Sequence, residues 1–328
     1  MITEPTEKRG VMRAVWLKEF GGPEVLVAAD TAEPVAGPGQ ALIEVEFANI
    51  TFIETQIRSG HGPFKVELPM ILGNGVGGVV SSVGAEADAG LVGRRVVAGL
   101  GGSGGYAERA AVDVGALIEV PEAVELADAV ALLADGRTAT LLARAAGLRA
   151  GDRVLVEAAA GGVGTLLVQL AGASGARVIG AAGGTRKVEL VRDLGAEMAV
   201  DYRDPGWPDR VRETVGGVDV VFDGVGGAIS REAFELLDRG GRMLSYGLAS
   251  GAWAAISDEA AVERGVTILR GAGGTPEELR ALTAGALAEA AAGRLRPVIG
   301  QRFPLDRAAD AHEAIQSRAT VGKTLLEV

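Results

Sequence analysis

The chain has 328 residues, 48% of them hydrophobic, which is enough to bury a large core, and we expect two domains. Its net charge of −11, from 32 basic and 43 acidic residues, argues against general binding to nucleic acids or anionic membranes. The absence of cysteine from the sequence excludes disulfides and thiolate metal sites and indicates a cytoplasmic protein.

The first part of the chain has short strand-like runs separated by Gly and Pro clusters, which is typical of a compact all-β unit. We assign residues 1–125 to this unit and expect the polar residues 1–10 to be a flexible tail. Its predicted strands are Val11–Leu17, Ala41–Phe47, Gly78–Val83, Arg95–Leu100 and Tyr106–Val112.

The pattern changes at residue 126, where two helical runs, Leu126–Leu133 and Thr138–Ala146, precede an alternation of strands and helices. Six strands with helical crossovers predict an α/β fold with a doubly wound parallel sheet in residues 126–270. The predicted strands are Arg153–Ala158, Arg177–Ala181, Met198–Asp201, Val218–Asp223, Arg242–Tyr246 and Val266–Leu269. The helices are Thr165–Ala173, Lys187–Leu194, Pro208–Val215 and Ser230–Leu237.

Residues 271–328 return to mixed structure, and we expect them to rejoin the first unit. The predicted elements are the helices Pro276–Ala292 and Arg307–Gln316 and the strands Val298–Phe303 and Thr324–Val328. The parallel-sheet domain would then be inserted in the mainly-β domain, with a cleft between the two.

A glycine-rich turn joins the strand Arg153–Ala158 to the helix that follows it. The turn reads A-x-x-G-x-x-G through Ala158, Gly161 and Gly164, close to the dinucleotide-binding fingerprint. Small residues there let the backbone approach a pyrophosphate, which the N–H groups of a helix N-terminus then bind. Because the chain holds 50 glycines, a chance match is the alternative, and the flanking strand and helix argue against it.

The second predicted strand of this domain lacks the acid that would hold the ribose 2′-hydroxyl of NAD. No Asp or Glu occurs between Gly175 and Lys187, and Arg186 precedes that lysine. A carboxylate there would repel a 2′-phosphate, whereas Lys or Arg would pair with it. The sequence therefore favours NADPH. Alternatively, Arg186 and Lys187 are only charges on an exposed helix.

Three segments resemble one known family: Arg13-Ala-Val-Trp-Leu-Lys-Glu-Phe-Gly-Gly-Pro-Glu-Val-Leu26, Ala158-Ala-Ala-Gly-Gly-Val-Gly164 and Gln316-Ser-Arg-Ala-Thr-Val-Gly-Lys-Thr-Leu-Leu326. The chain is similar to the zinc-independent quinone oxidoreductases, the zeta-crystallin-like branch of the medium-chain dehydrogenases/reductases. The resemblance implies a Rossmann domain inserted in a GroES-like catalytic domain, an NADPH cofactor and a homodimer. It also implies cofactor contacts, at Gly183, Lys187, Tyr202 and Arg318 for the adenosine 2′-phosphate end and at Thr138, Tyr246 and Gly247 for the nicotinamide side. The other expected cofactor contacts are Phe52, Gly161, Gly162, Val163 and Gly164.

The residues expected of the zinc-dependent relatives are missing. Their Gly-His-Glu motif corresponds here to Gly73-Asn74-Gly75, and there is no cysteine to complete a zinc site. Of the two histidines, His312 lies in a predicted helix, where a structural role is expected. We therefore expect no metal. Without a Lewis acid, reduction of an already electrophilic acceptor is favoured over oxidation of an alcohol.

The chain departs from the family next to the expected nicotinamide. The usual Asn-Phe-x-Asp run appears as Thr51-Phe-Ile-Glu54, and nearby Tyr positions appear as Gln56 and a Gly-containing stretch, His61–Phe64. Thr51 and Glu54 are the candidate catalytic residues, since each keeps a polar group near the acceptor. Neutral drift and a reshaped acceptor pocket are both open. His61 is either a proton donor or a solvent-exposed loop histidine.

The primary hypothesis is an NADPH-dependent reductase that transfers hydride to a small quinone. The alternative is reduction of a C=C bond in an α,β-unsaturated carbonyl, such as an enone, enal or enoyl thioester. A non-enzymatic lens-protein or RNA-binding role is a third class, against which the acidic charge argues. The apolar strand Val266–Leu269 is the predicted edge of the sheet, and through it we expect the homodimer to form.

Overall fold

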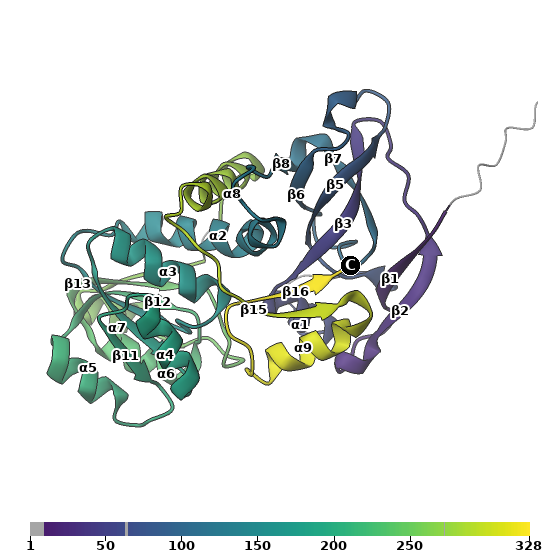
Figure 1. Cartoon of the computed structure of the whole chain (residues 1–328). Helices are drawn as coiled ribbons and strands as arrows, with labels where there is room; N and C mark the ends of the chain where they lie inside the picture. Colours follow the sequence, from purple (N-terminus) through teal and green to yellow (C-terminus); the bar gives the residue numbers. More distant parts are fainter. Residues whose placement is uncertain (1–9, 63–64, 272) are drawn as a thin grey trace, which may run out of the picture. The chain divides into compact units, whose positions relative to one another are not determined.

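The computed structural model describes residues 10–62, 65–271 and 273–328 (Figure 1). Residues 1–9 of the expected flexible tail lie outside the described residues, as do Pro63, Phe64 and Ala272. Within the described ranges, no helix combines the length and the apolar character needed to cross a membrane.

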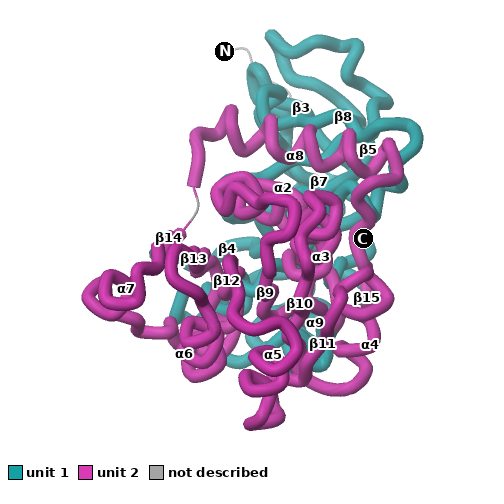
Figure 2. Tube along the Cα trace, turned by 90° about the vertical axis from the view of Figure 1, so that its left-hand side faces the viewer, with its two compact units in different colours: residues 1–133, 301–320, 324–328 teal, residues 134–300, 321–323 magenta. Residues whose placement is uncertain are grey.

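The chain divides into two compact units (Figure 2). Unit 1 comprises Met1–Leu133, Gln301–Thr320 and Thr324–Val328, and unit 2 comprises Ala134–Gly300 and Val321–Lys323. Unit 2 thus contains residues 271–300, which the sequence analysis grouped with the returning segment. Their helix, α8 (Pro276–Ala291), buries Leu282, Thr283, Ala286 and Leu287, and nothing in its sequence alone indicated which unit it joins.

The passage from unit 1 to unit 2 occurs inside a single helix, α2 (Leu126–Ala146). The sequence predicted two helical runs here, separated near Gly136, and that separation is wrong. A glycine inside a helix costs only about 1 kcal/mol relative to alanine. Gly136 is buried, and the apolar residues on both sides of it keep the helix continuous.

Unit 1 is built on two sheets that are antiparallel in their described pairings. The larger sheet has the order β15-β16-β3-β5-β6-β8, with β7 also paired to β3, and the smaller has the order β2-β1-β4. Helix α9 packs on α1 within this unit (Figure 1). The bounds are β1 Val11–Leu17, β2 Leu26–Ala32, β3 Gln40–Ile50, α1 Phe52–Arg58, β4 Met70–Ile71, β5 Gly75–Val83, β6 Arg95–Gly99, β7 Arg109–Asp113, β8 Leu117–Glu119, β15 Ile299–Pro304, α9 Ala308–Gln316 and β16 Lys323–Glu327.

Unit 2 is a six-stranded parallel sheet in the order β11-β10-β9-β12-β13-β14, which confirms the doubly wound fold. Helices cover both faces: α3 contacts β9 and β10 and α4 contacts β10 and β11, whereas α5 contacts β11 and α6 contacts β12 and β13. The bounds are β9 Arg153–Glu157, α3 Gly162–Ala173, β10 Arg177–Ala182, α4 Thr185–Asp193, β11 Met198–Asp201, α5 Trp207–Val215, β12 Val218–Asp223, α6 Gly227–Glu235, β13 Leu237–Ser245, α7 Asp258–Arg264 and β14 Thr267–Arg270.

The alternation of side chains along the parallel strands explains why both faces are covered. Leu155 and Ile179 point to the face that carries Trp207 and Phe234, and all four are in one buried cluster. On the other face, a Cβ on Gly180 would lie 2.1 Å from a methyl carbon of Val191 in α4. Strands buried on both faces read as near-continuous apolar runs, which is the pattern that predicted them.

Five elements were not predicted from the sequence because they are short or polar: β2, α1, β4, β8 and α7. Single turns of 3₁₀ helix complete the described structure, at Pro23–Val25, Ala89–Leu91, Val114–Ala116 and Leu305–Arg307.

Candidate functional site

The glycine-rich turn has the strand–turn–helix context that its sequence predicts. β9 ends at Glu157, Gly161 is the N-cap of α3, and Ala158 adopts a positive φ of 47°. A Cβ on Gly164 would lie 2.2 Å from the Ala158 carbonyl oxygen, so that position accepts only glycine. The first turn of α3 thus approaches its preceding strand closely and presents its N–H groups at the carboxyl edge of the sheet.

A buried ion pair borders this turn. A Cβ on Gly162 would lie 2.0 Å from Asp135 Oδ2, and the other Asp135 oxygen accepts a 3.1 Å hydrogen bond from Lys323 Nζ. The chain end is held to the same turn, since the Gly322 N–H donates to the Ala160 carbonyl at 2.7 Å. Sequence reasoning missed both members of the pair. The Gly322-Lys323 dipeptide was noted only for its resemblance.

Three of the residues predicted for the 2′-phosphate end, Gly183, Lys187 and Tyr202, lie in unit 2 after the ends of β10 and β11, whereas the fourth, Arg318, belongs to unit 1. A Cβ on Gly183 would lie 3.0 Å from the Tyr202 ring, so the glycine lets the ring and the turn approach each other. Lys187 is half-buried in the first turn of α4, and its N–H donates to the Gly184 carbonyl.

An acid does reach this turn, although from β11 and not from β10. The Asp201 carboxylate accepts a hydrogen bond from the Gly184 backbone, and Arg203 Nη2 donates to it at 2.8 Å. The hydrogen bond from Arg203 is the main reason that the pKa of Asp201 falls to about 2. The guanidinium neutralises the carboxylate, so the turn remains compatible with an anionic ligand. Arg203 was missed because it follows Tyr202 on an exposed loop.

The candidates for the nicotinamide side lie at the end of β13 and in α2. The N–H groups of Tyr246 and Gly247 both donate to the Asp223 carbonyl, at 2.9 and 3.3 Å. A Cβ on Gly224 would lie 2.6 Å from the Tyr246 hydroxyl, so the ring lies over the loop that follows β12. Burial, followed by the charges of Glu157 and Asp223, raises the pKa of Tyr246. Thr138 is half-buried in α2.

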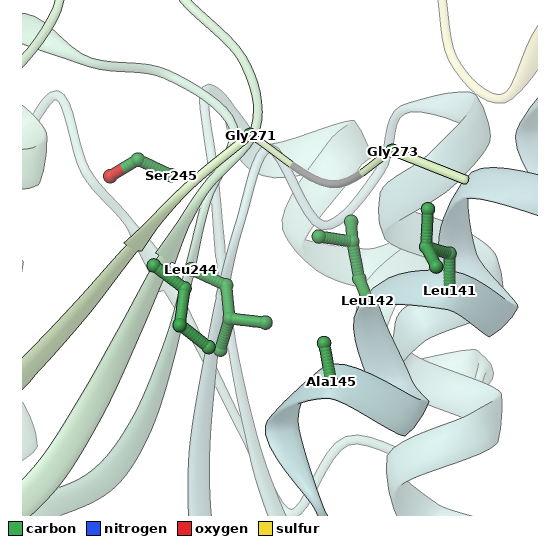
Figure 3. Close-up of a pocket in the computed structure, with 8 residues that line it drawn as sticks. Leu141, Leu142, Ala145, Leu244, Ser245, Gly271 and Gly273 are labelled. Atoms are coloured by element: carbon green, nitrogen blue, oxygen red, sulfur yellow. The ribbon is translucent and has the colours of Figure 1, made fainter. Parts of the chain in front are cut away.

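Unit 2 also contains an apolar pocket of about 230 Å³ (Figure 3). Leu141, Leu142 and Ala145 of α2 form one wall, and Leu244 comes from β13. The Ser245 hydroxyl is turned away from Leu142 and donates to Asp223 Oδ2 at 2.7 Å. With no charged side chain in its lining, this pocket suits hydrocarbon and not phosphate.

In unit 1, the candidate catalytic residues form a capping box at the start of α1. The Thr51 N–H donates to Glu54 Oε2 at 2.6 Å, and the Thr51 hydroxyl donates to the same oxygen at 3.1 Å. The other oxygen, Oε1, accepts the Asn74 N–H at 2.8 Å. Glu54 is only 1% exposed, so this geometry favours a positioning role for its carboxylate.

A buried tyrosine and histidine extend this network. Tyr106 Oη lies 3.3 Å from Glu54 Oε2 and 3.0 Å from His312 Nε2. Burial and the nearby Arg58 charge lower the pKa of His312 to about 3, so the imidazole is neutral at physiological pH. The burial of His312 and its contact with Tyr106 fit the structural role expected of it. Sequence reasoning missed Tyr106, which gave no signal beyond its place in a strand-like run.

The remaining candidates are more exposed. Phe52 is half-buried at the first position of α1, whereas Arg318 is exposed in the turn after α9 with a φ of 57°. His61 is exposed and lies outside any helix or strand. This is the exposed loop position that was the alternative to a role as proton donor. Within the described part of the chain, no three His, Asp or Glu side chains are grouped so as to hold a metal ion.

Both units are similar in sequence to known protein families. Residues 37–122 match the alcohol dehydrogenase GroES-like domain, and residues 162–288 match the zinc-binding dehydrogenase family. A quinone oxidoreductase from Pongo abelii is 35% identical over 321 residues, covering 96% of this chain and 98% of the relative. The chain belongs to the quinone oxidoreductase branch of the medium-chain dehydrogenase/reductase superfamily.

Solved quinone oxidoreductases have the same fold over their full length. The Escherichia coli enzyme in complex with NADPH superposes with a TM-score of 0.89 at 31% identity, covering 96% of this chain and all of that one. A mycobacterial relative, also solved with NADPH, gives a TM-score of 0.88 at 34% identity, covering 97% of this chain and all of that one. The GroES-like and Rossmann domains that the resemblance implied are therefore confirmed.

Proposed function

We propose that this quinone oxidoreductase family member is an NADPH-dependent reductase that transfers hydride to a small quinone without a metal ion. The observation that carries the proposal is the pairing of the glycine-rich turn with a second turn that carries Lys187 and in which Arg203 neutralises Asp201. Support also comes from relatives named quinone oxidoreductase at 33–35% identity over nearly the whole chain.

The residues of unit 2 fit the nucleotide. Gly161, Gly162 and Gly164 leave room beside the N-terminus of α3, where side chains would clash with Ala158 or Asp135. The Gly161 N–H donates to the Ala158 carbonyl at 2.8 Å, so the N–H groups of Gly162, Val163 and Gly164 in the first turn of α3 would hold the pyrophosphate. Lys187 and Arg203 would hold the 2′-phosphate, with Tyr202 and Gly183 beside it. Thr138, Tyr246 and Gly247 are proposed for the nicotinamide side, and Phe52 and Arg318 are proposed contacts from unit 1.

NADPH, when bound, supplies a hydride, and a quinone that takes up that hydride and one proton becomes the hydroquinone. The chain supplies binding, orientation and an environment poor in water. Thr51 would donate to the acceptor oxygen as negative charge develops there, once its hydroxyl turns from Glu54. Glu54 keeps Thr51 and the start of α1 in place through three hydrogen bonds.

The metal-free part of the proposal rests on donor chemistry. The sequence has no cysteine, and Asn74 and Gly75 occupy the positions of the His and Glu of zinc-dependent relatives. The Asn74 N–H is engaged by Glu54, which fixes this segment as a structural turn. Elemental analysis should find zinc well below one per chain, and exhaustive chelation should leave the rate unchanged. Stoichiometric zinc that tracks activity would refute the proposal.

A cytoplasmic homodimer is also proposed. β14 is the terminal strand of its sheet, and in the described residues it pairs only with β13. Leu269 on this strand is 37% exposed and Val262 on α7 is 77% exposed, so a second copy has an apolar edge to cover. Sedimentation at micromolar concentration should give twice the chain mass, and Leu269→Lys should shift it to monomer.

The activity test is NADPH oxidation with 9,10-phenanthrenequinone, 1,4-benzoquinone and a panel of α,β-unsaturated carbonyls. The proposal predicts the highest kcat/KM with a quinone. Turnover of enones with inert quinones would replace it with C=C reduction. No NADPH consumption with any acceptor would refute both activities.

A further inference from the structure

Two buried carboxyl groups meet at the carboxyl edge of the sheet in unit 2. Glu157 ends β9 and Asp223 ends β12, and both side chains are 0% exposed. These two strands are neighbours, and the chain order reverses between them. In a doubly wound sheet this reversal point is where a ligand binds. The pair therefore lies beneath the proposed nucleotide, behind the glycine-rich turn.

The two hydrogen bonds that join the carboxyl groups through the Ser230 hydroxyl require an additional proton. Ser230 Oγ lies 2.7 Å from Glu157 Oε2 and 2.6 Å from Asp223 Oδ1. A serine hydroxyl has one hydrogen, so it can donate to only one of these two oxygens. The other short contact needs a hydrogen from a carboxylic acid. One of the two carboxyl groups is therefore protonated.

The surrounding donors decide which group holds the proton. Asp223 accepts from the Ser245 hydroxyl at 2.7 Å and from the Gly226 N–H at 2.9 Å. Apart from the contact with Ser230, Glu157 accepts only the Val225 N–H, at 3.2 Å, and its Oε1 has no hydrogen-bond partner among the described residues. Asp223 thus has more hydrogen-bond donors than Glu157, and we assign the negative charge to it. Burial and the Asp223 charge accordingly raise the pKa of Glu157 well above its ordinary value.

The other ionisable groups around the pair keep the local charge small. Burial raises the pKa of the Tyr246 hydroxyl, and both carboxyl groups, followed by Asp135, add to that rise. Asp135 is itself neutralised by Lys323. The charge beneath the turn is thus about −1 with Glu157 protonated and −2 without that proton. A second buried negative charge would repel an anionic nucleotide.

We propose that Glu157 is a positioning residue for the nucleotide, acting as a neutral buried acid that donates to Ser230. It links the end of β9 to the loop 224–227 and the start of α6, so that the turn over which the nucleotide lies stays fixed. The inference rests on the proposed use of NADPH only for the identity of the ligand.

The protonation state is tested first, by infrared spectroscopy and without any ligand. The folded wild-type chain at pH 7 should show the carbonyl stretch of a buried carboxylic acid, and Glu157→Gln should lose it. Glu213→Gln, at an exposed position of α5, is the control and should keep the band. An unchanged spectrum in Glu157→Gln would overturn the proposal.

The positioning role is tested by NADPH affinity, measured as fluorescence quenching. Glu157→Gln keeps a neutral donor to Ser230 and should bind NADPH within about twofold of wild type at pH 7. Glu157→Ala should bind about tenfold more weakly, the scale of one lost hydrogen bond in a buried network. Ser230→Ala, which removes only the bridging oxygen, should do the same and replaces Glu157→Ala if that variant does not fold.

A titration from pH 7 to 10 separates a neutral acid from a simple packing group, because the 2′-phosphate is fully ionised throughout this range. Wild-type affinity should fall in step with the loss of the infrared band, and Glu157→Gln should not show that fall. Equal weakening in Glu157→Gln and Glu157→Ala would overturn the proposal. These measurements need no quinone, so an inactive reductase would contradict the proposed function and leave this inference intact.

Discussion

The Lys323 ammonium group lies 3.1 Å from an Asp135 oxygen, and the two side chains are only 4% and 13% exposed. The pair adjoins the glycine-rich turn, where the second Asp135 oxygen occupies the space that a side chain on residue 162 would need. Such a pair contributes little net stability compared with an apolar pair, yet removal of one partner leaves a buried charge uncompensated.

Lys323→Met should therefore destabilise the fold by about 3–5 kcal/mol, measured by urea unfolding. The double variant Lys323→Met with Asp135→Asn should recover most of that loss, because no buried charge remains. Arg294→Met removes an ion pair with side chains 63% and 44% exposed and should cause a much smaller change. Equal effects of Lys323→Met and Arg294→Met would contradict this account.

Lys187→Ala should weaken NADPH binding by about 1.5–3 kcal/mol, the scale of a charged hydrogen bond, and leave NADH binding nearly unchanged. The adjacent Arg186 is exposed, so Arg186→Ala is the matched control and should affect NADPH less. Titration of both nucleotides by fluorescence quenching checks the prediction. Equal affinities of the wild-type chain for NADPH and NADH would contradict it.

The sequence predicted unit 2 well, because strands buried on both faces carry continuous apolar runs. Met198–Asp201 and Val218–Asp223 have the predicted bounds. It predicted unit 1 less completely, since a strand such as β2 (Leu26–Ala32) ends in five small or polar residues in a row, from Ala28 to Ala32. For the site, local motifs were predictable and contacts between distant segments were not. Motifs local in sequence, such as Gly161 to Gly164, were recognised.

Contacts between distant segments were not predictable from one sequence. Asp135 and Lys323 are 188 residues apart, and Tyr106 and His312 are 206 residues apart. Nothing in the local sequence of either pair signals its partner, because the contact is created by the fold. Ser230 is a further case, since a serine in an amphipathic helix carries no sign of two buried carboxyl groups beside it.

His312 should make the fold sensitive to acid. Its pKa falls to about 3 in the folded chain, because burial and the Arg58 charge disfavour the imidazolium, against an ordinary value of 6.5. Between these values the unfolded chain binds the additional proton, so stability decreases as pH falls from about 6.5 to about 3, by about 1.4 kcal/mol per pH unit. His312→Gln should remove this slope in urea unfolding between about pH 6 and 4, whereas exposed His61→Gln should retain it.

Glu157 should act in the opposite direction. Burial and Asp223 raise its pKa in the folded chain, so above its ordinary value of 4.5 the folded chain holds a proton that the unfolded chain has lost. Stability then decreases as pH rises, by about 1.4 kcal/mol per pH unit, until the raised pKa is passed. Glu157→Gln should lack this slope, so its free energy of unfolding should rise relative to that of the wild-type chain between about pH 5 and 7. If the stability of the two proteins changes with pH in parallel, the folded and unfolded chains do not differ in the protonation of Glu157, and the prediction is wrong.

The capping box at α1 gives two variants with different expected kinetics. Thr51→Val removes the hydroxyl proposed to donate to the acceptor oxygen, and it leaves the Thr51 N–H bonded to Glu54. We expect kcat to fall, with NADPH affinity nearly unchanged. Loss of a preorganised donor costs about 2.7–4 kcal/mol, and a water molecule that takes its place would make the loss smaller.

Glu54→Gln acts through position instead. Its amide group would face at least one of the N–H donors of Thr51 and Asn74, so one buried hydrogen bond is lost and stability should fall by about 1–3 kcal/mol. If Glu54 transfers a proton, Glu54→Gln should lower kcat more than Thr51→Val does. If Glu54 only positions Thr51, Glu54→Gln should lower kcat less than Thr51→Val does. Steady-state kinetics with the best quinone, at saturating NADPH, distinguishes them. Unchanged kcat in both variants would leave the cofactor, water and backbone groups as the whole catalytic apparatus.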